Sequence, residues 1–196
     1  VILILAILPT IIYPISLYFL ANPIGNIDTG AIIGSYIGLL FLGIAFIAIS
    51  IFCSSVSKNP IVAFLLAIFV CFFFYYAFDA ISGFSALYAF AYEIKSFGIQ
   101  EHYFNISRGV LTGADLIYFI SLSAIFLLFS IGHLNRQYTP TKKTLTVYLG
   151  VLVFAFIVNQ PFITSLLGRL DFTADKRFTL SETSKNTVKE VKKHMF

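Results

Sequence analysis

Side chains that could do chemistry gather in one short polar stretch, which contains Glu101, His102 and Arg108. A histidine beside a carboxylate is typical of acid–base and metal sites. A single adjacent pair, however, falls short of the three or four ligands of a zinc site, so we predict no metal site here. Because the stretch lies between apolar runs, we interpret these three residues either as an extracellular gate or as part of a cap over a helical bundle.

Elsewhere the sequence offers little catalytic chemistry. Cys53 and Cys71 lie in or beside apolar runs without Cys-x-x-Cys spacing, and we expect them to be small packing residues. Asp79 follows a run of aromatic residues and is expected to be an interfacial carboxylate. The sequence contains no nucleotide-binding loop, no Gly-x-Gly-x-x-Gly and no His-Glu-x-x-His motif. We therefore predict no catalytic residue and no cofactor, and we expect any ATP hydrolysis to occur in another polypeptide.

Composition assigns the chain to a membrane. Of its 196 residues, 59% are hydrophobic and only 11% are charged, and the mean hydropathy is +0.92. An average soluble domain carries about 25% charged residues, so charge this sparse cannot cover a water-facing surface. The net charge of +4 comes mostly from Arg136–Lys143 and from the tail after Arg169. No basic stripe is interleaved with stacking aromatics, which excludes a nucleic-acid partner.

Five stretches supply the roughly 20 apolar residues that a membrane-spanning helix needs. They are Val1–Ala21, Ala31–Cys53, Pro60–Ile81, Ala114–Leu134 and Leu145–Leu167. Pro9 and Pro14 predict a kink in the first span. Because the sequence begins inside this apolar run, we expect an internal piece of a longer protein.

Polar residues mark the starts of several spans. Asp28 precedes the second span, and Asn59 followed by Pro60 predicts an N-cap with proline in the first helical position. Thr112 and Asp115 have the spacing of a capping box before the fourth span. We expect all these acids to act as caps and as partners of the helix dipole.

The long loop between the third and fourth spans has its own helical pattern. Apolar residues recur at helix-like intervals from Phe84 to Phe97, Gly98 is placed to end such a helix, and a polar return follows. We therefore predict an all-α membrane protein. It is a polytopic bundle of about five transmembrane helices with a re-entrant or interfacial extracellular helical hairpin, followed by the start of an extracytoplasmic domain.

Lysine and arginine in the short loops predict the orientation. Lys58 lies between the second and third spans, and Arg136, Lys142 and Lys143 lie between the fourth and fifth. These loops should face the cytoplasm, and the tail from Gly168 should lie outside, since long translocated segments escape the charge rule.

Three glycines, Gly30, Gly34 and Gly38, recur every fourth residue at the start of the second span. This spacing lets another helix approach closely in lipid. The partner is either a neighbour in the same bundle or a second subunit, and the motif alone does not distinguish them.

Several segments resemble ABC-2-type permeases of the gliding-motility (GldF-like) family. Asp28–Gly43 resembles their fourth span, and Ser54–Pro60 resembles the cytoplasmic turn after it. Gly98–Val110 and Asp115–Phe119 resemble the extracellular stretch before the last span and the start of that span. Leu170–Ser181 is similar to the opening of the auxiliary GldG-like subunit.

The resemblance implies a permease and an auxiliary subunit joined in one chain. Residues 1–137 would be the last four spans of the permease, 138–144 a cytoplasmic linker, 145–167 the auxiliary membrane anchor and 168–196 the start of its outer domain. It also implies two further spans and a coupling helix before residue 1, and a separate ATPase subunit facing the turn at Lys58 and Asn59. A second permease copy and membrane lipid would complete the partners, in a bacterial inner membrane.

The sequence therefore predicts one of two functions. The first is the permease subunit of an ABC-2-type exporter linked to gliding motility and driven by a separate ATPase. The alternative is a non-transporting scaffold that anchors an envelope motility or secretion machine. An intramembrane enzyme is disfavoured because the spans lack positioned acid, base or metal groups.

Overall fold

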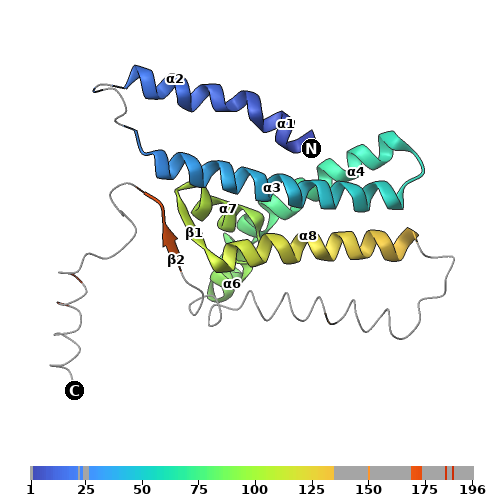
Figure 1. The fold of residues 1–196 in the computed structure, drawn as a ribbon. Coiled ribbons are helices and arrows are strands. Elements are labelled where there is room, and N and C mark those ends of the chain that lie inside the picture. The colour runs from blue at the N-terminus through green and yellow to red at the C-terminus, as the bar shows by residue number, and fades with distance from the viewer. Residues whose placement is uncertain are drawn as a thin grey trace.

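Figure 1 shows the fold of the computed structural model, which describes residues 2–21, 23, 27–134, 150, 169–173, 184 and 187. Long helices run side by side, and shorter elements gather near one end of them (Figure 1). Apart from Gly150, the predicted fifth span lies outside the described residues, as do the predicted linker and most of the tail.

Within the described residues, four helical segments are long and apolar enough to cross a membrane, which indicates a multi-pass membrane protein. They are Ile2–Leu20, Thr29–Val56, Pro60–Ser82 and Gly113–Leu134, and their ends agree with the first four predicted spans to within three residues. The spans comprise α1 (Ile2–Ile7), η1 (Leu8–Ile11), α2 (Ile12–Leu20), α3 (Thr29–Val56), α4 (Pro60–Phe72), η2 (Phe73–Ala77), α5 (Phe78–Ser82) and α8 (Gly113–Leu134). The shorter elements are η3 (Ser85–Phe90), α6 (Ala91–Lys95), α7 (Ile99–Ser107), β1 (Val110–Thr112) and β2 (Arg169–Asp171).

The expected kink of the first span takes the form of a 3₁₀ turn, η1, which contains Pro9. Pro14 has no N–H to donate to the carbonyl oxygen of Thr10, four residues earlier. A backbone N–H at the end of η1 donates to that oxygen, and so does the hydroxyl of Tyr36 on α3, at 2.8 Å. The Tyr36 bond joins the first span to α3.

The third span is interrupted by a π-helical segment, η2, in the aromatic run from Phe72 to Phe78. Phe74 of this segment packs against Phe126 of α8, with 5.3 Å between ring centroids. Phe73 packs against Phe78 of the same span, at 5.9 Å. A π turn adds a residue to the helix and changes which side chains face the neighbour. The hydropathy pattern carries no signal for this change.

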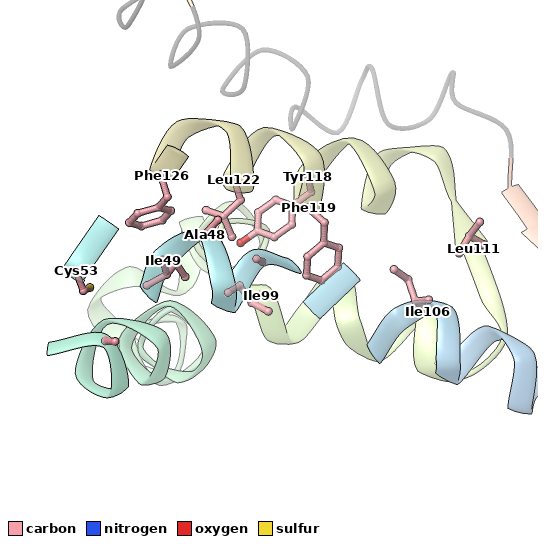
Figure 2. Packing of buried hydrophobic residues seen from close by; sticks show 12 residues of the cluster. Ala48, Ile49, Cys53, Ile99, Ile106, Leu111, Tyr118, Phe119, Leu122 and Phe126 are labelled. Carbon is pink, nitrogen blue, oxygen red and sulfur yellow. The ribbon is translucent and has the colours of Figure 1, made fainter. Parts of the chain in front are cut away.

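The core lies between α3 and α8, which run in the same direction (Figure 1). The buried stripe of α3 carries Ala45, Ala48, Ile49 and Cys53 at helical spacing, and its two alanines and its cysteine are small enough to allow close approach. Figure 2 shows the larger residues of α8 that fill the facing side: Tyr118, Phe119, Leu122 and Phe126. The end of the bundle where α3 and α8 begin is the α7 end. The end where they finish, next to the turn between α3 and α4, is the turn end.

Two of the predicted helix caps are confirmed. A carboxylate oxygen of Asp28 accepts from the Ala31 N–H at 3.0 Å, and the side-chain oxygen of Asn59 accepts from the Ile61 N–H at 2.9 Å. The capping box predicted for Thr112 and Asp115 does not form, because Oδ1 of Asp115 bonds to a histidine and Oδ2 has no hydrogen-bond partner among the described residues. Asp115 does lie in the first turn of α8, where a carboxylate interacts favourably with the helix dipole, as expected.

The loop before α8 differs from the expected pattern. The segment from Phe84 to Phe97 forms η3 and the short α6 instead of one helix, while the expected polar return forms helix α7. In α7 the buried residues Ile99, His102 and Ile106 share one face, and this amphipathic face packs against α3. The β1–β2 pair is a further departure from the all-α expectation.

Candidate functional site at the α7 end

The α7 end is closed by α7 and β1, which pack against the glycines of α3. A Cβ atom on Gly34 would lie 2.6 Å from Cα of Gly109, and one on Gly38 would lie 3.0 Å from Cγ2 of Ile106. A Cβ atom on Gly30 would overlap with the carbonyl of Phe172. All three glycines predicted to pack therefore meet elements of this same chain. Gly30 and Gly34 meet backbone atoms at distances that leave no room for a Cβ, whereas Gly38 meets the side chain of Ile106, which would have to shift slightly.

The turn from α7 into β1 depends on Gly109. Its φ of +83° lies in the left-handed region that favours glycine, and its N–H donates to the carbonyl of Ile106 at 2.9 Å, which ends the helix. The hydroxyl of Ser35 on α3 lies 2.8 Å from the carbonyl oxygen of Ser107, at the end of α7. The Ser35 hydrogen bond and the close contacts at Gly34 and Gly38 thus hold α7 on α3.

A buried pair, His102 and Asp115, holds α7 on α8. Nδ1 of His102 lies 2.7 Å from Oδ1 of Asp115, and Nε2 lies 2.9 Å from the carbonyl oxygen of Ser96. The two side chains are 9% and 4% exposed. The ring of Tyr118 stacks on the imidazole at 3.9 Å between centroids, and its hydroxyl donates to the carbonyl of Phe97 at 2.7 Å.

The hydrogen-bond partners determine which atoms of the His102–Asp115 pair carry protons. A backbone carbonyl only accepts, so Nε2 must carry a proton. One further proton then lies between Nδ1 and Oδ1, and its removal would set two lone pairs against each other. Because Nε2 is occupied by Ser96, the imidazole has no nitrogen left to act as a base on a substrate. The cluster is a buried latch that joins α6, α7 and α8.

A second, exposed pair fixes the loop before α7 to the third span. Nζ of Lys95 lies 2.9 Å from Oδ1 of Asp79, and the side chains are 45% and 39% exposed. This hydrogen bond and the charge of Asp79 raise the pKa of the Lys95 ammonium above its ordinary value. Asp79, expected to be an interfacial carboxylate, is the partner of this lysine.

The structure does not bring the three predicted gate residues together. His102 is buried, whereas Glu101 and Arg108 are exposed, and the guanidinium of Arg108 lies 3.6 Å from the ring centroid of Phe104. In the described part of the chain, no group of three potential metal ligands is present. The predicted ATPase-facing residues, Lys58 and Asn59, are exposed in the turn between α3 and α4, at the opposite end of the bundle.

Sequence reasoning missed the partners of His102. The signal was present in part, because Ile99, His102 and Ile106 share one helical face and a buried histidine needs partners on both nitrogens. Asp115 lies thirteen residues further on, and nothing local joins the two.

Comparison with known proteins gives no match to a protein-family model, to a curated protein or to a solved structure.

Proposed function

We propose that this chain is the membrane-spanning permease subunit of an ABC-2-type exporter in a bacterial inner membrane. It is linked to gliding motility and driven by a separate ATPase subunit. The α7 end then faces outward and the turn end faces the cytoplasm. The observation that carries the proposal is the closure of the α7 end, where α7 and β1 fill the space between the beginnings of α3 and α8.

This closure has the properties of a gate that opens at low cost. Contacts at Gly34 and Gly38 are van der Waals contacts, and lipid provides no hydrophobic drive to keep helices together. The polar fastenings are the Ser35 bond to α7 and the His102–Asp115 latch. Movement of α7 off the glycine face of α3 breaks the Ser35 bond and van der Waals contacts, while the latch stays intact because it joins α7 to α8.

Helix α3 connects the gate to the proposed ATPase side. Its 28 residues span about 42 Å at 1.5 Å per residue, which exceeds the hydrocarbon thickness of about 30 Å. One end carries Gly30 and Gly34, and the other leads into the exposed turn at Lys58. A displacement of that turn by a cytoplasmic subunit would be carried along α3 to the gate.

The alternative, a non-transporting scaffold, is favoured by a different observation. Strand β2 pairs with β1, so the segment after Arg169 is attached directly to the bundle. A membrane anchor that presents an outer domain to an envelope machine needs such an attachment and needs no gate.

Reconstitution with the cytoplasmic ATPase that co-purifies with the chain distinguishes the two functions. We expect the chain to change the rate of ATP hydrolysis in vesicles. Gly34→Ala, whose Cβ would overlap with Gly109, should lower this coupled rate while the complex still assembles. Gly83→Ala is the matched control, because its nearest atom would lie at an ordinary 3.4 Å. If no ATPase co-purifies, the exporter proposal fails. If Gly34→Ala prevents assembly and no solute moves with ATP, the scaffold is correct.

A further inference from the structure

Residues 169–173 add a strand to the bundle beside β1, a segment more than fifty residues earlier in the sequence. β2 pairs antiparallel with β1, with Val110 opposite Asp171, Leu111 opposite Leu170 and Thr112 opposite Arg169. The Phe172 N–H continues the ladder by donating to the carbonyl of Gly109 at 2.9 Å. Figure 1 shows β2 beside β1 at the α7 end.

The strand lies against Gly30 and Gly109, whose lack of a side chain leaves room for it. The carbonyl of Phe172 occupies the space where a Cβ of Gly30 would be, and Cγ2 of Thr173 would lie 3.4 Å from a Cβ of Gly109. Thr173 is only 5% exposed. Its N–H and hydroxyl both donate to Oδ1 of Asp171, at 3.1 and 2.6 Å, which closes the end of the strand in a tight turn.

We propose that Gly109–Thr112, together with Gly30, forms a strand-receiving lip whose occupant is the segment Arg169–Thr173 of this chain, and that the seated strand holds the gate closed. The lip belongs to both sides of the gate. Gly30 is on α3, whereas β1 leads directly into α8 at Gly113. The outer ends of α3 and α8 can therefore separate only when the strand leaves the lip or moves with one of them.

This coupling is reciprocal by thermodynamic linkage. If the seated strand favours the closed arrangement, a pull on the segment after Thr173 favours the open one, and opening of the bundle releases that segment. The attachment itself follows from strand pairing and applies to a scaffold as well as to an exporter. Only the link to gating rests on the proposed function.

Disulfide trapping tests the seating of the strand. The hydrogen-bonded pair Gly109–Phe172 makes Thr112–Arg169, three steps away, a non-hydrogen-bonded pair with Cα atoms about 4.5 Å apart, within the range of a disulfide. The variant Thr112→Cys with Arg169→Cys is made in a background without Cys53 and Cys71. A protease site is inserted between Gln137 and Tyr138. After mild oxidation and cleavage, the two fragments should stay joined until they are reduced.

The matched control is Thr112→Cys with Phe172→Cys, because three residues of offset separate the positions by about 10 Å along the strand. We expect the in-register pair to cross-link at least tenfold faster. Co-expression of two differently tagged chains, each with one cysteine, tells whether the strand comes from the same chain or from a second copy. Equal rates for the two pairs, or cross-links only between copies, would overturn the proposal.

A second measurement does not depend on cross-linking. Thr173→Cys should react slowly with a membrane-impermeant maleimide while the strand is seated. Gly30→Ala must displace the strand and should raise the labelling rate at least tenfold, whereas Gly83→Ala should leave it unchanged. An unchanged rate in Gly30→Ala refutes the lip even if the chain works as an exporter. A raised labelling rate with unchanged ATP turnover refutes only the link to gating.

Discussion

The latch between His102 and Asp115 gives the sharpest test of how the α7 end is held. The proposed perturbations are Asp115→Asn, which keeps the shape of the carboxylate, and Asp115→Leu, which removes every polar atom. His102→Phe keeps a ring to stack on Tyr118 and removes both nitrogens. The expected ranking follows from the proton that Nδ1 and Oδ1 share at 2.7 Å.

Asparagine can donate to Nδ1 of a neutral imidazole, whose Nε2–H still donates to the carbonyl of Ser96. Only the charge assistance is lost, so Asp115→Asn should cost about 1 kcal/mol. Asp115→Leu leaves Nδ1 buried without a partner, and the loss of one member of a buried pair costs about 3–5 kcal/mol. The double variant with His102→Phe removes both partners and should be less destabilised than Asp115→Leu alone.

The assay is equilibrium unfolding of the purified chain in mixed detergent micelles with increasing dodecyl sulfate, followed by circular dichroism. Hydrogen exchange of the α7 amides reports local opening. Equal destabilisation by Asp115→Asn and Asp115→Leu would refute the reasoning. So would a double-mutant coupling energy near zero between positions 102 and 115, since residues in one hydrogen-bond network should couple by about 0.5–3 kcal/mol.

Three further substitutions test single contacts in the same unfolding assay. Tyr36→Phe removes the hydrogen bond that joins α3 to the carbonyl of Thr10 and should cost about 0.6–1 kcal/mol, the scale of one hydrogen bond in a membrane bundle. Lys95→Met should cost about 0–1 kcal/mol, because its pair with Asp79 is exposed. Since the pKa of Lys95 is raised, the stability from this pair is present below the ordinary value of 10.5 and is lost as pH rises above it, and Lys95→Met should abolish that alkaline loss. Ser130→Ala should be neutral or stabilising by about 1 kcal/mol, because this buried hydroxyl finds no hydrogen-bond partner among the described residues.

The membrane-spanning helices were predictable from the sequence because their signal is local. A run of about 20 apolar residues is sufficient to mark a span, and the caps at Asp28 and Asn59 act over two or three positions. Lipid imposes little periodicity on the helices, so the pattern says where spans lie but not which faces meet.

The site was harder to predict because its interactions are not local. The π turn at Phe73–Ala77 shifts a helix face without any change in hydropathy. The bond from His102 to Asp115 and the pairing of Thr112 with Arg169 each join segments that no periodicity connects. The glycine row at Gly34 and Gly38 showed that something approaches α3 closely, and the structure shows that it is α7 and the turn after it.

Strand pairing and loop charge lead independently to one topology. The pairing requires Arg169 to lie on the same side of the membrane as Thr112, which precedes α8. Leu134 ends α8 at the opposite end of the bundle from β2 (Figure 1). The positions of lysine and arginine in the short loops predict the same arrangement without any reference to strands. A basic tail on the outer side contradicts the charge rule when taken alone, but in the proposed orientation a strand held by Gly30 and Gly109 gives the start of that tail a specific place to bind.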